Sequence, residues 1–160
     1  MEHNIAQLAA KIVAIISPYS PALTGFIKLT GAGLAKWVGE KGGEQLWGVA
    51  QRAWATIRSR NTNDVELSSA MNMVGARPDD ETRRKELIKI LAERFKGDSE
   101  LTRELEKLFA ENVEAVQVVT ANQDSTIETV IQEIWGGGKQ TITADNRSNV
   151  KGVTQKITNR

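Results

Sequence analysis

The sequence predicts a mainly α protein, in which an N-terminal helical bundle is followed by a C-terminal two-repeat cross-β segment of β-arch or β-solenoid type. Up to about residue 111, apolar residues recur at helical spacing between helix start and stop signals. From Val113 onward the chain has no proline and is rich in Val, Ile and Thr, which favour strands. We therefore expect a helical bundle over residues 1–111 and a β-forming region over residues 112–160.

Two helices are expected in the first 60 residues. The first covers about residues 3–16, where apolar residues recur every third or fourth position: Ile5, Leu8, Ile12 and Ile16. The segment 17–21 ends it, and Ser20 is expected to cap a second helix with Pro21 at its first position. Because no further proline follows before residue 60, the second helix is expected to continue to about that point.

Three shorter helices are expected next. One fits residues 64–74 and is closed by Gly75. Another begins at the acidic run 79–81, which suits a helix start, and ends at Gly97. Ser99 is expected to cap the last one. Together with the first two helices, these complete the predicted bundle.

The C-terminal region contains a repeat. Residues 116–134 and 139–157 align without a gap at an offset of 23. Seven of the nineteen aligned positions are identical, where chance would give about one or two. The identical pairs are Gln117/Gln140, Thr120/Thr143, Ala121/Ala144, Ser125/Ser148, Val130/Val153, Gln132/Gln155 and Ile134/Ile157. We infer that one copy arose by duplication of the other.

The two copies carry opposite charges at three aligned positions: Asp124 with Arg147, Glu128 with Lys151, and Glu133 with Lys156. Strands in a fibril lie about 4.8 Å apart, so stacking a copy on itself would place like charges in contact. Alternating the copies turns each clash into a row of ion pairs. Such pairs are individually weak, but together they select the register.

Each copy is expected to fold back on itself, because the linker of residues 135–138 reaches about 13 Å whereas nineteen extended residues span about 60 Å. Turn-forming residues lie in the middle of each copy, at 122–125 and 145–148. The residues expected to stack are Gln117, Val119, Asp124, Glu128, Val130, Gln132, Glu133, Ile134, Gln140, Ile142, Arg147, Lys151, Val153, Gln155, Lys156 and Ile157. The open alternative is two hairpins of an ordinary four-stranded sheet on the bundle.

Composition argues against several functions. The chain has no cysteine and one histidine, His3, and it lacks a metal-ligand cluster or a nucleophile elbow, so we expect no enzyme, no cofactor and no metal. Residues 1–60 carry seven Lys/Arg against three Asp/Glu, which suits an anionic membrane better than nucleic acid. The sequence shows no signal peptide and no uncharged apolar span, so a cytoplasmic protein is expected.

Two stacked repeats of about twenty residues behind a helical domain resemble the fungal HET-s-type prion effectors. The copies, of the form Gln-x-Ile-x-Ala-Asp/Asn-x-x-Ser-x-Val-x-x-Val-x-Gln-x-Ile, look closer to bacterial amyloid signalling motifs. The segment Gly152–Gln155 is similar to the core of the necroptotic RHIM class, although the first copy has Thr129 in place of Gly152. Such motifs follow a helical Bell domain, which is similar in role to the HeLo and HeLo-like domains. The resemblance implies an amyloid-forming segment and a membrane-disrupting cell-death effector.

The helical part holds two sets of candidate residues for membrane contact or helix packing. The apolar stripe of the first helix fits either a bundle member or a membrane-inserting element. In the second helix, small residues recur every fourth position, which lets helices approach closely in lipid: Gly31, Ala35, Gly39 and Gly43. The alternatives are that these glycines allow close helix crossings in a soluble bundle, or that the helix is broken there.

Two functions therefore stay open. The resemblance implies an effector that self-assembles into fibrils when a NOD-like receptor with a matching motif templates its fold, and that moves from the cytoplasm to membrane lipids. The alternative is a non-toxic adaptor or structural module that oligomerises through its C-terminal repeats. The sequence indicates no nucleic-acid partner for either.

Overall fold

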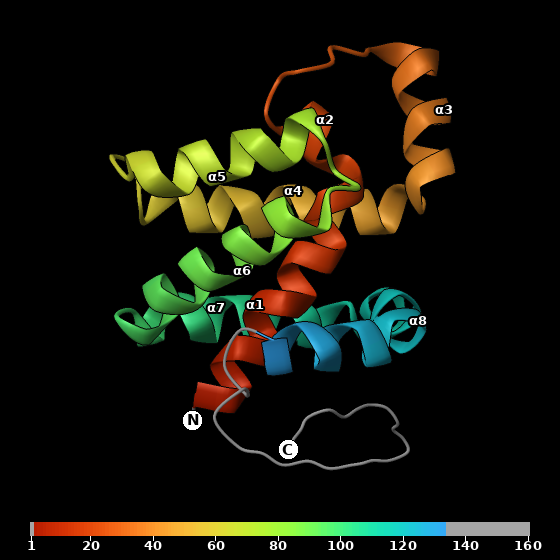
Figure 1. The fold of residues 1–160 in the computed structure, drawn as a ribbon. Helices are drawn as coiled ribbons and strands as arrows, with labels where there is room; N and C mark the ends of the chain where they lie inside the picture. The colour runs from red at the N-terminus through yellow and green to blue at the C-terminus, as the bar shows by residue number, and fades with distance from the viewer. Residues whose placement is uncertain (1, 134–160) are drawn as a thin grey trace. The chain divides into compact units, whose positions relative to one another are not determined.

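The computed structural model describes the backbone of residues 2–133 and the side chains of residues 4–121 and 127–133. Its helices are α1 (Glu2–Ile16), the 3-10 turn η1 (Ser17–Tyr19), α2 (Ser20–Leu23), α3 (Gly31–Lys41), α4 (Glu44–Ser59), α5 (Val65–Ala76), α6 (Glu81–Lys96), α7 (Ser99–Glu111) and α8 (Val113–Ile131) (Figure 1). The chain divides into two compact units, Met1–Glu128 and Thr129–Arg160. Only residues 129–133 of the second unit are described. The mainly helical fold class is confirmed.

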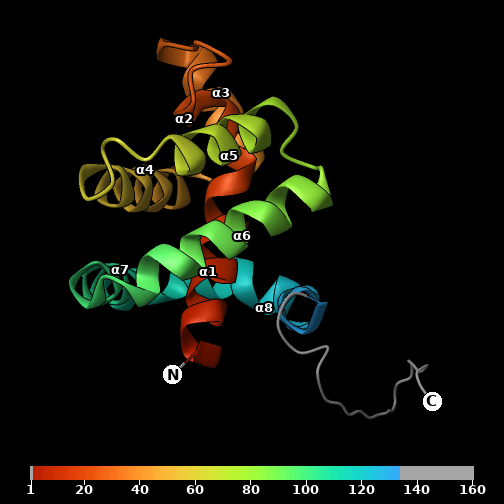
Figure 2. The same ribbon diagram turned by 60° about the vertical axis from the view of Figure 1, so that its left-hand side comes forward.

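Helix α1 forms the centre of the first unit, and Figures 1 and 2 show α4 and α6 crossing it. Eight of its side chains are buried: Ala6, Leu8, Ala9, Ala10, Ile12, Val13, Ile15 and Ile16. A helix that is apolar on nearly every side is stable only when other elements cover it. The outer helices extend this arrangement, since α5 packs on α6 and α2, and α7 packs on α4.

Aspartates cap the N-termini of helices α5, α6 and α7. The carboxylates of Asp64, Asp80 and Asp98 accept hydrogen bonds from backbone amides in the first turns of α5, α6 and α7. These bonds satisfy donors that every helix start leaves unpaired. The prediction that Ser99 caps the last of these helices is wrong, because Asp98 makes the bond to the amide of Leu101 at 3.0 Å.

Two of the capping aspartates also bind an arginine that is distant in the sequence. Arg94 of α6 donates to Asp64 at 2.5 and 3.2 Å. Arg60, which follows α4, donates to Asp98 at 2.6 and 3.0 Å. The bonds from Arg94 lower the pKa of Asp64, and those from Arg60 lower the pKa of Asp98. The stability that these ionised carboxylates contribute is therefore present at neutral pH and is lost as the pH falls through their lowered pKa values.

The expectation of one long helix up to about residue 60 is wrong, because the chain breaks after α2 and again between α3 and α4. The second break falls at Gly42 and Gly43, whose φ angles of 145° and 103° suit glycine and few other residues. Ser20 does not cap α2, since its hydroxyl donates to the carbonyl of Ser17 at 2.6 Å. As a result, α3 stands apart from the helices around α1 in both views (Figures 1 and 2).

Residues Val113–Ile131 form helix α8, where the sequence predicted strands of the first repeat. The buried residues of this segment explain the difference, because they lie at helical spacing: Val116, Thr120, Ile127, Val130 and Ile131. The strand expectation does not hold for these residues in this structure. Ile134 and the second copy, residues 139–157, lie outside the described residues. The cross-β form of an assembly stays a prediction.

Gly75 does not end α5, as the sequence predicted, but lies inside it beside Thr24. A Cβ atom added at Gly75 would lie 2.3 Å from Oγ1 and 3.0 Å from Cγ2 of Thr24. The Thr24 hydroxyl donates to the carbonyl of Ser20 at 2.7 Å, which holds this side chain in place. The glycine is therefore required by a close approach between α5 and the end of α2.

Two glycine-to-alanine substitutions are expected to change the free energy of unfolding in opposite directions. Gly48→Ala, inside α4, places its Cβ where no described atom lies within 4 Å apart from its sequence neighbours and the backbone of its own helix. It should stabilise by about 0.5–1 kcal/mol through helix propensity. Gly75→Ala should destabilise by about 1–3 kcal/mol, because the methyl group overlaps Thr24. Urea denaturation followed by circular dichroism measures both, and Thr24→Ala should restore part of the loss. Equal effects of the two alanines would contradict the packing at Gly75.

Candidate assembly and membrane-contact sites

The first repeat lies on α8 and is divided between its faces. Gln117 and Glu128 are exposed, Val119 is half-buried and Val130 is buried, while Gln132 and Glu133 are exposed after the helix ends. The side chain of Asp124 lies outside the described residues. The sequence predicted that alternate residues of the first repeat would lie on one face of a strand. In the helix, the buried residues instead recur every three or four positions.

The second repeat was expected to provide eight stacking residues, all outside the described residues: Gln140, Ile142, Arg147, Lys151, Val153, Gln155, Lys156 and Ile157. Their predicted pairing with the first copy therefore stays a prediction.

Helix α8 is composed of residues that favour strands. Ten of its nineteen residues are Val, Ile or Thr, whose branched Cβ restricts the side chain in a helix. The hydroxyl of Thr120 donates to the carbonyl of Val116 at 3.0 Å, a bond that slightly weakens a helix. We call the first unit, Met1–Glu128, the helical unit. Residues 116–128 of α8 belong to it, with Val116, Thr120 and Ile127 buried and a hydrogen bond of 3.2 Å from Gln7 Nε2 to Glu128 Oε2. Tertiary contacts therefore hold α8 helical against its local preference.

The candidate residues of the first helix belong to the core. Leu8, Ile12 and Ile16 are buried and Ile5 is half-buried. Of the two roles that the sequence left open for this helix, the structure shows a bundle member. Contact between these residues and a lipid would require α1 to leave the helices that cover it.

The small residues of α3 share an open face. Gly31, Ala35 and Gly39 are exposed, and a Cβ added at Gly39 would meet no described atom within 4 Å. Gly43 does not share that face, because it is part of the break and directly precedes α4. The expected stripe of four therefore contains three residues. Of the two alternatives for these glycines, a close helix crossing is not seen in the described part of the chain, whereas a broken helix is confirmed at Gly42 and Gly43.

A cluster of aromatic side chains attaches α3 to the rest of the unit. Tyr19 is the central residue of this cluster, and the sequence pattern did not indicate it. The ring centroid of Tyr19 lies 6.0 Å from that of Trp37 and 5.4 Å from that of Trp47. Its hydroxyl donates to the carbonyl of Gly43 at 3.2 Å. Tyr19 therefore reaches from η1 to the break between α3 and α4. The only signal in the sequence was one aromatic residue between two prolines.

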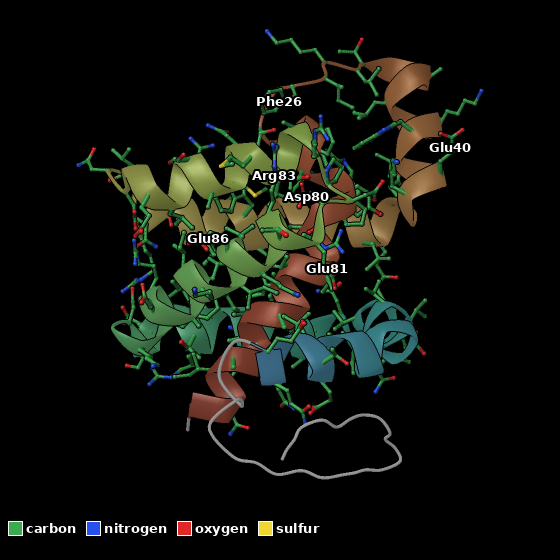
Figure 3. The ribbon with its side chains drawn as sticks, in the orientation of Figure 1. Phe26, Glu40, Asp80, Glu81, Arg83 and Glu86 are labelled. Atoms are coloured by element: carbon green, nitrogen blue, oxygen red, sulfur yellow. The ribbon has the colours of Figure 1, made fainter. Side chains whose placement is uncertain are left out.

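A second feature that the sequence analysis missed is an apolar surface beside α3. Phe26 is 56% exposed and Leu29 is 36% exposed, on the loop that joins α2 to α3. Phe26 also lines a groove of about 380 Å³ with Val65 and Met73 of α5, which are themselves 79% and 48% exposed. Figure 3 shows Phe26 on this loop and Glu40 on α3.

Membrane-spanning helices and metal-ligand clusters are both absent from the described part of the chain. No helix in residues 2–133 is long and apolar enough to cross a membrane. Among the side chains that the structure describes, those of residues 4–121 and 127–133, no group of three or more His, Asp or Glu is placed to hold a metal ion.

Comparisons with known proteins found no matching family model, no matching curated protein and no matching solved structure. The function therefore has to be inferred from the residues and their geometry.

The titration of Tyr19 tests its burial, because it is the only tyrosine in the chain. Burial raises the pKa of Tyr19 to about 12, since the charged phenolate is poorly solvated there. The near-ultraviolet absorbance of tyrosinate should therefore appear well above the ordinary pKa of about 10. The folded state keeps its proton while the unfolded state loses it, so the free energy of unfolding should fall as the pH rises between these values. Tyr19→Phe should show less of this loss, and a midpoint near 10 in the folded protein would contradict the burial.

Proposed function

We propose that this chain is a regulated cell-death effector of an immune or antiphage system. It is activated by prion-like templating of its C-terminal repeats into a cross-β form, and it acts by membrane disruption through its helical unit. The observation that carries the proposal is the gapless repeat with opposite charges at all three positions where the first copy is charged inside the aligned segment. Such a pair is suited to alternating stacking, which a globular sheet does not require.

The position of the first copy supports a switch. Residues 116–128 belong to the first compact unit as part of α8, and the proposed cross-β form needs the same residues as strands. One segment cannot hold both structures at once, so assembly withdraws α8 from the helical unit. Withdrawal removes the cover of Val116 and Ile127, and it breaks the bond between Gln7 of α1 and Glu128. Assembly is thereby coupled to loosening of the helices around α1.

The partners follow from the same proposal. A NOD-like receptor that carries a matching repeat templates the first rung, further copies of this chain add to the fibril, and membrane lipids are the target. The protein waits in the cytoplasm and moves to the membrane on activation. It performs no chemical step.

One observation favours the alternative of a non-toxic adaptor or structural module. No helix in the described residues could span a membrane, and an adaptor needs none. In that case the repeats serve only to oligomerise the chain or to attach it to a partner.

Charge reversal tests the proposal, because it alters stacking without altering the apolar stripe. Arg147→Asp, Lys151→Glu and Lys156→Glu together would place acid over acid at three positions of each rung. This variant should assemble slowly at low salt and faster at high salt, where exposed charges are screened. Adding Asp124→Arg, Glu128→Lys and Glu133→Lys restores opposite signs, so the sixfold variant should assemble with itself.

Fibril growth is measured by thioflavin fluorescence, and the effect on cells by growth and dye uptake after addition of preformed fibrils. The effector should stop growth and admit dye only in variants that assemble. Assembly without dye uptake would favour the adaptor. If the threefold variant assembles as fast as the original chain at low salt, alternating stacking is contradicted.

Hydrogen exchange tests the switch in α8. Backbone amides of residues 116–128 should show helical protection before addition of fibrils and the strong protection of a cross-β core afterwards, while amides of α1 lose protection. The matched reference is α5, which does not contain repeat residues. Retention of the helical pattern in α8 within the fibril, with protection gained only in residues 139–157, would refute the switch.

A further inference from the structure

The segment between α2 and α4 differs from the rest of the helical unit in its exposure. We call residues 24–41 the α3 lobe. Among its side chains only Val38 is buried. The loop at its start exposes Phe26 and Leu29, and the aromatic cluster of Tyr19 and Trp37 attaches its base to the unit. Large apolar side chains grouped at a surface mark a contact site for a partner or a membrane.

The charge of the α3 lobe is positive. It contains Lys28, Lys36 and Lys41 against one acid, Glu40, and all four are exposed. Lys28 lies between the exposed residues Phe26 and Leu29. Apolar side chains interleaved with lysine are the pattern of a segment that lies at an anionic lipid surface, where the lysines meet headgroups and the apolar groups enter the acyl boundary.

The apolar surface continues from the lobe onto α5. Phe26 lines the groove of about 380 Å³ together with Val65 and Met73, and both of these residues are exposed. The groove therefore belongs to the same patch as the loop. The apolar residues of α1 provide no comparable surface, because most of them are buried.

We propose that the α3 lobe and the adjoining groove form the membrane-docking surface of this protein, and that their ligand is an anionic lipid surface. The inference rests on the proposed function and specifies its point of contact. The eleven residues of α3 span about 16 Å at 1.5 Å per residue, about half of the 30 Å hydrocarbon core. The lobe therefore lies in the plane of the interface and does not cross it.

Assembly of the chain into fibrils regulates how strongly this surface binds a membrane. A single lobe offers three lysines and few apolar side chains, so one chain binds weakly and reversibly. A fibril displays one lobe for every chain, and lobes bound to the same vesicle act at a high effective concentration. Templated assembly therefore converts a weak contact into a firm one.

Vesicle flotation of the full chain tests the proposal. Phosphatidylcholine vesicles with and without phosphatidylserine are the probe. The unassembled chain should float with the anionic vesicles, less so at high salt, and its fibrils should bind far more tightly. Each lysine near such a surface contributes about fivefold in binding, so Lys28→Glu with Lys36→Glu should weaken it more than about twentyfold. Phe26→Ser with Leu29→Ser should also weaken it.

Two matched controls use exposed residues outside the lobe. Lys89→Glu with Lys107→Glu makes the same change in net charge on α6 and α7, and Val113→Ser with Val118→Ser removes exposed apolar groups from α8. Both should leave flotation of the unassembled chain within about threefold of the original chain. Circular dichroism checks that every variant keeps its helices.

The outcomes separate this inference from the proposed function. Equal flotation of the lobe and control variants, equal binding to neutral and anionic vesicles, or no binding by the original chain in either form would overturn the inference. Seeded toxicity that survives the lobe substitutions would overturn it while leaving the effector function in place. Selective loss of flotation in the lobe variants, combined with continued growth of seeded cells that express the original chain, would support the docking surface and contradict the effector function.

Discussion

The burial of α1 on nearly all sides constrains the rest of the helical unit. Because its side chains are apolar around most of the circumference, the helix needs neighbours on every side, and α4 and α6 supply two of them. Withdrawing any one neighbouring helix exposes apolar surface on α1, so even a limited rearrangement of the unit costs free energy. At about 25 cal/mol per Å² of apolar surface, even a partly uncovered helix loses several kcal/mol, a large fraction of the stability of a small domain.

Sequence periodicity located most of the bundle, but it offered the break at the glycines of the second helix only as an alternative and missed the break after α2. The helices near residues 3–16 and 81–96 follow from apolar spacing and from acidic start signals, and the structure has both. The break at Gly42 and Gly43 depends on a contact that spacing does not reveal, since Tyr19 of η1 bonds to the carbonyl of Gly43. Asp98, which caps α7 in place of Ser99, likewise bonds to Arg60, which is far away in the sequence.

For the candidate sites too, the sequence indicated some residues, while the role of each depended on tertiary contacts. The apolar stripe of the first helix could be recognised, but its role depends on what covers it, which only the arrangement of α4 and α6 decides. The exposed surface at Phe26 was missed because the sequence predicted a continuous helix through the loop. In α8, local preference and tertiary contact disagree. Val and Ile favour strands, yet the same residues fill a helical stripe, so propensity alone could not decide between them.

The run of α8 through position 129 bears on how the two copies diverged after duplication. In the second copy the aligned residue is Gly152, whereas the first copy has Thr129. Glycine inside a helix costs about 1 kcal/mol relative to alanine, roughly twice the cost of threonine. Under the proposed switch, selection on the first copy acts through a helix before activation and a strand afterwards. Position 129 therefore has to suit both a helix and a strand, and threonine meets these two requirements better than glycine does.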